Sequence, residues 1–204
     1  MKIYDLSYKI ENNMIAYSQE ETPHITSLFS IEKDGFNVTS LKISSHIGTH
    51  IDVPFHMIKD GKNICDFPID TFFGKGKCIS FKKLETFDFN SKEMENIDYL
   101  LIYTGWDIFW NKDDYFKNYP IISNEIISKI LISNLKGVGL DCISPDSYDS
   151  ENMEKHKLLL KNNKIIVENL CSLKNLLDKD FYFSCAPLKI EADGCPVRAT
   201  AIIF

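Results

Sequence analysis

The chain has 204 residues, 44% of them hydrophobic, and a formal net charge of −6. This length and composition suit a folded domain with a sizeable core and exclude general disorder. The acidic balance, without any basic run, gives little support to a nucleic-acid partner, and no apolar run approaches the roughly 20 residues of a membrane span. The six cysteines form no C-x-x-C pair and no export signal is evident, so we expect reduced thiols and a cytoplasmic protein.

Short strands are expected at both ends of the chain, and helices mainly in its second half. In chain order, strands are predicted at residues 2–8, 25–32, 36–44, 77–81, 99–104, 137–141, 164–168, 181–184, 188–190 and 198–204. Helical segments are predicted at residues 91–96, 124–134, 151–162 and 170–177, the third capped by Ser150. Residues 57–76 are expected to be mostly loop, because they hold several turn-forming glycines and a proline. This order indicates one α/β domain over residues 1–204, with a mixed, partly barrel-like sheet and flanking helices.

The second strand of the predicted pair has an irregular apolar pattern. Its apolar residues change parity, from Phe36 and Val38 to Leu41 and Ile43. A bulge near Thr39-Ser40 would reconcile the two halves, and so would burial of both faces of the strand. The stretch that follows lies at the end of this predicted strand pair, where a rigid scaffold can hold a functional loop.

That stretch, residues 46–56, contains His46, His50 and His56, with Asp52 between the last two. Imidazole and carboxylate are ligand types that Zn²⁺ and Mn²⁺ share. A straight strand would separate the first histidine from the aspartate by about 20 Å, and a helix would put them on different faces. A metal site therefore requires the segment to curl, which Gly48 allows. The alternative is a buried strand end with separate, hydrogen-bonded histidines.

Two further ligand-type residues lie in the second half of the chain. His156 lies in the polar stretch Glu154-Lys155-His156-Lys157, which is typical of a solvated helix surface. Glu168 ends an apolar strand, where a carboxylate lies either at the rim of a sheet or beside a specific partner. The residues alone leave both questions open.

The aromatic residues Trp106, Phe109 and Trp110 follow the apolar strand at 99–104. Aromatic residues just beyond a strand end usually pack in the core or in loops. They could also line a pocket for a flat substrate, and both interpretations remain open here.

The stretch from His46 to His56 matches every fixed position of H-x-G-T-H-x-D-x-P-x-H, and it resembles the signature of the cyclase-like metal-dependent hydrolases, a family that includes bacterial kynurenine formamidases (arylformamidases) and isatin hydrolases. Further stretches with this resemblance are Ile3–Ser7, Thr104–Trp106, Gly139–Asp141, His156–Leu160, Ile165–Leu170, Pro187–Ile190 and Asp193–Ala199. The resemblance therefore extends over essentially the whole chain. It implies the swivelling β/β/α fold and hydrolysis of a C–N bond in an amide, arylformamide or cyclic amide.

The resemblance also implies a role for each candidate residue. His46 and His50 would bind the first of two divalent metal ions, His156 the second, and Asp52 and Glu168 would bridge them. Zn²⁺ is the expected metal and Mn²⁺ the alternative. A water held between two such ions would be hydroxide at neutral pH, able to attack a carbonyl carbon. His56 would then be the catalytic acid and base, the partner a small-molecule substrate, and the protein a homodimer or higher homo-oligomer.

One stretch departs from the family pattern. Where the family usually has Y-P-G-D, and formamidases add a substrate-stacking tryptophan, this chain has Tyr17-Ser18-Gln19-Glu20 with no tryptophan near. We therefore expect N-formylkynurenine to be a poor substrate or none. A metal-dependent lyase or cyclase, and a non-catalytic metal-binding protein, are the alternative functions that the sequence leaves open.

Overall fold

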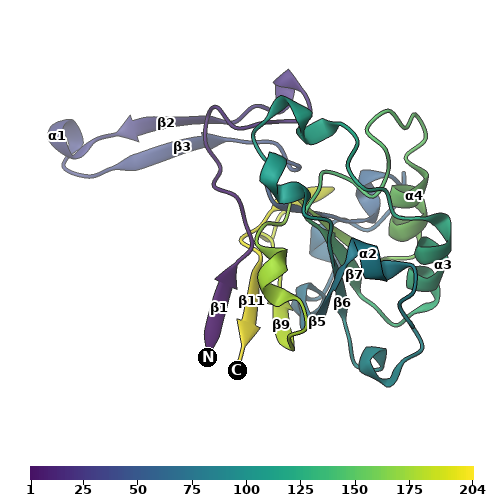
Figure 1. The fold of residues 1–204 in the computed structure, drawn as a ribbon. Coiled ribbons are helices and arrows are strands. Elements are labelled where there is room, and N and C mark those ends of the chain that lie inside the picture. The colour runs from purple at the N-terminus through teal and green to yellow at the C-terminus, as the bar shows by residue number, and fades with distance from the viewer.

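Four parallel strands form the centre of the protein, which a computed structural model describes over residues 1–204 (Figure 1). These strands are β5 (Phe73–Ser80), β6 (Tyr99–Tyr103), β7 (Gly137–Leu140) and β8 (Ile165–Glu168). They pair in that order, each parallel to the next. The strands expected at 99–104, 137–141 and 164–168 are therefore confirmed as the middle of one sheet.

Antiparallel strands extend the sheet on both sides. One side carries β9 (Phe181–Ser184), β11 (Thr200–Ile203) and β1 (Lys2–Asp5), so the two chain ends lie side by side (Figure 1). The other side carries β4 (His50–Asp52) and β10 (Gly194–Pro196). The complete order is β1-β11-β9-β5-β6-β7-β8-β4-β10, one nine-stranded mixed sheet that curls like part of a barrel. The predicted α/β class and mixed, partly barrel-like sheet are confirmed.

Strands β6, β7 and β8 are buried along almost their whole length because the sheet is covered on both faces there. Leu101 of β6 belongs to a core shared with β8, β9 and β11, whereas its neighbour Leu100 belongs to a core under α3 (Asn124–Ile132) and α4 (Glu154–Lys161). The first core holds Val167, Phe183 and Ala201. The two remaining short helices are α1 (Ile31–Asp34) and α2 (Phe81–Leu84), and the connections contain several 3₁₀ turns. No helix has the length and apolar character needed to cross a membrane.

Several local predictions are wrong, among them the helix at 170–177, of which only Leu173–Leu176 is helical, as a 3₁₀ turn. Gly74 and Gly76 lie inside strand β5 rather than in a loop, because the missing side chain of Gly76 leaves the space that the ring of Phe181 occupies. Residues 188–190 form no strand, and the short strands β4 and β10 were not anticipated. Helix α4 begins at Glu154 instead of 151, because Ser150 accepts a hydrogen bond from the amide of Met153, a residue with left-handed backbone that precedes the helix.

A separate two-stranded sheet projects from the body (Figure 1). It consists of β2 (His24–Phe29) and β3 (Val38–Lys42), with α1 at its tip, and we call residues 24–43 the arm. The predicted pair of strands is confirmed, but the bulge is in β2, between Ser27 and Phe29, and not near Thr39-Ser40. Strand β3 is regular and exposed on both faces, so neither explanation of its apolar pattern holds.

Candidate metal centre

The histidine stretch curls as a metal site requires. Residues 45–49 form bends and turns before β4 begins at His50, and Gly48 has a φ of +64°, a left-handed conformation that suits glycine. This curl brings Nδ1 of His46 to 2.8 Å from Oδ1 of Asp52. The extended arrangement, in which these two residues would lie about 20 Å apart, is thereby excluded.

Strand pairing brings the distant Glu168 to the same place. Strand β4 pairs antiparallel with β8, and His50 lies directly opposite Glu168. Nε2 of His50 lies 3.4 Å from Oε2 of Glu168 and 3.3 Å from Oδ1 of Asp52. The glutamate at the strand end therefore has specific partners and is buried rather than solvated at the rim.

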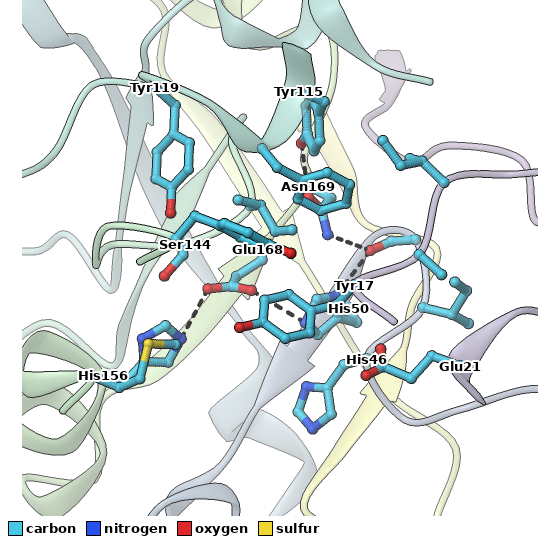
Figure 2. A pocket seen from close by; sticks show the side chains of 18 of the residues that line it. Tyr17, Glu21, His46, His50, Tyr115, Tyr119, Ser144, His156, Glu168 and Asn169 are labelled. Atoms are coloured by element: carbon cyan, nitrogen blue, oxygen red, sulfur yellow. Dashed lines mark hydrogen bonds and ion pairs between the residues drawn. The ribbon is translucent and has the colours of Figure 1, made fainter. Parts of the chain in front are cut away.

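Helix α4 supplies the second fully buried histidine, His156 (Figure 2). His156 is only 2% exposed, so the surface position suggested by its polar neighbours is wrong. Its Nε2 lies 3.0 Å from Oε1 of Glu168 and 3.6 Å from Oδ2 of Asp52. The structure thus joins His156 to the residues of the histidine stretch.

Asp146 positions this histidine, and sequence reasoning missed it. One oxygen of Asp146 lies 2.8 Å from Nδ1 of His156 and accepts a hydrogen bond from the amide of His156, and the other oxygen accepts one from the amide of Lys155. The same carboxylate therefore caps the first turn of α4 and also fixes the orientation of the His156 imidazole ring. Its only signal in the sequence is a turn-type Pro-Asp pair before the helix.

The buried carboxylates fit a cation. Asp52 is 1% exposed, and neither of its oxygens accepts a hydrogen bond of acceptable geometry, even from the histidines beside it. Burying an anionic group without hydrogen bonds is costly unless a positive charge compensates it. Two triplets have ligand atoms within 4.8 Å of one another: His46, Asp52 and His56 in one, His50, Asp52 and Glu168 in the other. Nitrogen and oxygen donors of this kind suit Zn²⁺ and Mn²⁺.

Hydrogen bonds on the outer side of the rings orient the histidines. Nδ1 of His50 lies 2.8 Å from the carbonyl oxygen of Gly48, just as Nδ1 of His156 faces Asp146. In both rings Nε2 is therefore the nitrogen that faces the carboxylates. Outer partners of this kind are usual for metal-binding histidines, because they fix the tautomer and the ring orientation.

The electrostatics of the cluster favour positive charge. Burial lowers the pKa of the His46 and His50 imidazoles, but the charges and hydrogen bonds of the neighbouring carboxylates, Asp52 above all, together outweigh it. They raise the pKa of His46 to about 9 and that of His50 to about 10. The pKa of Asp52 is held well below its usual range, since His46, His50 and His156 together outweigh its burial. Without metal, these histidines hold protons that a bound cation would replace.

His56 and the unpredicted Asp193 lie at the outer edge of the cluster. The His56 side chain is 24% exposed, and its Nδ1 lies 3.2 Å from Oδ2 of Asp193. The same oxygen lies 2.8 Å from Nε2 of His46. These hydrogen bonds lower the pKa of the Asp193 carboxyl far below its usual range. Asp193 begins one of the stretches that carry the family resemblance, which was the available signal.

A cavity of about 310 Å³ opens over the cluster (Figure 2). Its wall contains six aromatic residues: Tyr17, Trp110, Tyr115, Phe116, Tyr119 and Tyr148. The indole of Trp110 stacks on the ring of Tyr8, with ring centroids 3.8 Å apart, whereas Trp106 packs against the second core and donates a hydrogen bond to the carbonyl of Tyr115. Trp110 therefore lines the pocket and Trp106 packs against the core, so each of the two interpretations holds for one tryptophan.

The fold and the buried cluster of histidines and carboxylates are those of the cyclase family, as the comparisons with known proteins show. The family model described as putative cyclase matches residues 4–147, and the chain belongs to this family. An uncharacterized protein of Methanocaldococcus jannaschii is 41% identical over 177 residues, which are 85% of this chain and 88% of that protein. Kynurenine formamidase of Bacillus cereus is 30% identical over 200 residues, which are 96% of this chain and 94% of that enzyme.

Solved structures confirm the fold. Isatin hydrolase A from Labrenzia aggregata superposes with a TM-score of 0.84 at 22% identity, over 99% of this chain and 93% of that chain. A potential metal-dependent hydrolase with cyclase activity superposes with a TM-score of 0.80 at 23% identity, over 98% of this chain and 96% of that chain. The fold and family implied by the sequence motifs are thus confirmed.

Proposed function

We propose that this chain is a metal-dependent hydrolase that cleaves the C–N bond of an amide, an arylformamide or a cyclic amide. The observation that carries the proposal is the buried cluster of histidines and carboxylates at the base of an aromatic cavity. The relatives named kynurenine formamidase support the same reaction class.

The cluster would hold two divalent ions, Zn²⁺ first and Mn²⁺ as the alternative. His46 and His50 would bind one ion and His156 the other. The way in which Asp52 contacts the histidines supports this division: its Oδ1 faces His46 and His50, and its Oδ2 faces His156. Glu168 likewise faces His50 with one oxygen and His156 with the other, as a bridging carboxylate would. When bound, such ions polarise a carbonyl group and lower the pKa of water.

The protein's own residues would bind and orient the substrate. The aromatic wall would hold a flat apolar group, which places a carbonyl group of the substrate over the cluster and excludes bulk water. Ser144 and Glu21 are polar residues of the same wall and would contact polar substituents. The cavity volume of about 310 Å³ fits one small molecule.

His56 would carry the proton to the leaving nitrogen. Its imidazole lines the cavity, and Asp193 occupies its Nδ1, so its Nε2 remains for a substrate. An amide needs this protonation because an amide anion is a very poor leaving group. One ligand atom of the His56 ring also lies within 4.8 Å of ligand atoms of His46 and Asp52. The competing assignment is therefore that His56 is itself a metal ligand.

The six cysteines are all free thiols, which supports a reducing location, the cytoplasm.

The reaction class is tested by incubating the metal-replete protein with N-formylkynurenine, isatin and simple formamides in ¹⁸O-labelled water. Hydrolysis places the label in a product carboxylate. A product formed without label would indicate the lyase or cyclase alternative, and metal binding without turnover would indicate a non-catalytic protein. Glu168→Gln is the matched control and should lose turnover.

A further inference from the structure

Glu21 is the one charged residue of the cavity wall that lies outside the cluster of histidines and carboxylates. It belongs to the segment before the arm, and Figure 2 shows its side chain and that of Tyr17 extending toward the histidines. Neither triplet of potential metal ligands includes it. Its companions from the same segment of the wall, Ile15 and Ala16, are apolar. This carboxylate therefore faces the cavity without belonging to the metal centre.

The carboxylate of Glu21 has acceptor capacity left for a ligand. Its only side-chain hydrogen bond within the chain is a long one, from the hydroxyl of Ser18 to Oε1 at 3.4 Å, and Oε2 has no such partner. The residue is partly buried. A partly buried carboxylate between apolar side chains is stabilised by a positive charge beside it. A cationic group of a ligand would supply that charge.

Three aromatic rings from three different segments meet in the outer part of the same wall. The ring centroid of Tyr148 lies 5.3 Å from that of Tyr17 and 5.3 Å from that of Phe116. Tyr17 is 51% exposed and Tyr148 is 39% exposed, so these rings lie toward solvent, whereas His156 and Glu168 are buried at the base of the cavity. Aromatic rings attract an ammonium group through the negative charge of their faces. The outer wall therefore combines two kinds of group that recognise a cation.

We propose that the substrate carries a positively charged amine, which Glu21 and the three rings around Tyr148 bind. The amine would lie at the outer wall while a carbonyl group of the substrate lies over the cluster. The substrate class is then an arylformamide or a related amide with an aminoalkyl chain, and Glu21 is a specificity-determining residue. This inference deepens the proposed function and rests on it. N-formylkynurenine fits this class poorly, because it also carries a carboxylate, which Glu21 would repel.

Isothermal titration calorimetry with the metal-replete protein tests the charge preference without any turnover. The probes are two 2-aminophenyl ketones whose otherwise identical alkyl chains end in an ammonium group or in a methyl group. Wild-type protein should bind the ammonium compound about 10-fold more tightly. In Glu21→Gln this ratio should fall to about 2–5-fold, because only the rings then favour the cation. Glu20→Gln is the matched control: Glu20 is exposed and outside the cavity wall, and the same change of charge there should leave the ratio unaltered.

Wild-type protein that fails to bind the ammonium compound, or that binds the two ketones equally, would overturn the proposal. So would a ratio that Glu21→Gln leaves unchanged. The N-formyl derivatives of the same two ketones separate this inference from the proposed hydrolysis. Equal kcat/KM for both derivatives would contradict the ammonium preference and leave the hydrolysis standing. Tight binding of the ammonium compound without cleavage of either derivative would contradict the hydrolysis alone.

Discussion

A single oxygen of Asp193 joins His56 to His46: Oδ2 lies 3.2 Å from Nδ1 of His56 and 2.8 Å from Nε2 of His46. One ring belongs to the proposed metal centre and the other carries the proposed proton transfer. The carboxylate therefore links the two functions in space, because it fixes the orientation of both imidazoles. Its backbone is fixed in turn, since the amide of Val53 donates a hydrogen bond to the carbonyl of Asp193.

Replacing Asp193 by asparagine should impair turnover without emptying the site. The amide keeps the size of the side chain but removes the negative charge that both imidazoles face. We expect kcat to fall about 10–100-fold, the usual effect of removing an outer partner of a histidine, with KM within a few-fold and a shifted pH profile. In the double variant with His56→Ala the two effects should not add. Full additivity would show that Asp193 does not act through His56.

Replacing His56 by alanine should separate chemistry from metal binding. If the ring is the general acid and base, kcat should fall about 10²–10⁴-fold, because that is the usual contribution of such a group. Both metal ions and the fold should remain, and KM should change only a few-fold. His50→Ala is the control and should lose metal. Elemental analysis that finds one ion missing from His56→Ala would assign His56 as a ligand instead.

The metal-free protein should lose stability as pH rises from 7 to 10. The pKa values of His46 and His50 are about 9 and about 10 in the folded protein, above the usual 6.5 of an unfolded chain. Such groups stabilise the fold fully below about pH 6.5, and their contribution is lost as pH rises through the folded-state pKa. Thermal melts with a chelator should show this decline, and melts with excess Zn²⁺ should lack it, because metal-bound imidazoles have no such proton to release. Equal slopes with and without metal would contradict the assignment.

The aromatic cavity predicts the substrate's shape more than its identity. Trp110→Ala should raise KM for an aromatic substrate, since stacking on such a side chain contributes about 0.5–1.5 kcal/mol, or roughly 2–10-fold.

N-formylkynurenine should remain a weak substrate, with kcat/KM below about 10⁴ M⁻¹s⁻¹, because no tryptophan lies near Tyr17 in the sequence. Steady-state kinetics measures this value and the effect of Trp110→Ala. A higher value with the wild-type protein would contradict this expectation, and Trp110, in the same cavity as Tyr17, would be the first candidate for the missing face.

Strong local patterns made much of the fold predictable. The apolar run at Tyr99–Tyr103 predicted a buried strand, and the structure confirms it. The histidine stretch required a curl, and Gly48 was the residue predicted to allow it. Strands β4 and β10 were missed because three-residue strands have no periodicity to read. The glycines of β5 were predicted to lie in a loop, because the reason for Gly76, its close approach to the distant ring of Phe181, is not visible in the local sequence.

The outer part of the site was harder to predict for the same physical reason. The burial of His156 depends on where α4 packs, and its neighbours Lys155 and Lys157 suggested solvent. Asp146 and Asp193 act through contacts made only after folding, so no local pattern distinguishes them from other aspartates. The resemblance to a known family, rather than periodicity, therefore identified the more distant candidate ligands, His156 and Glu168.

The metal content of the purified protein, measured by elemental analysis during titration with Zn²⁺ or Mn²⁺, tests the account most directly. The account predicts about two ions per chain when metal is in excess. Glu168→Gln should weaken at least one ion markedly, because it removes a bridging charge from a buried site. Wild-type protein that never holds more than one ion per chain, with either metal in excess, would contradict the two-metal centre.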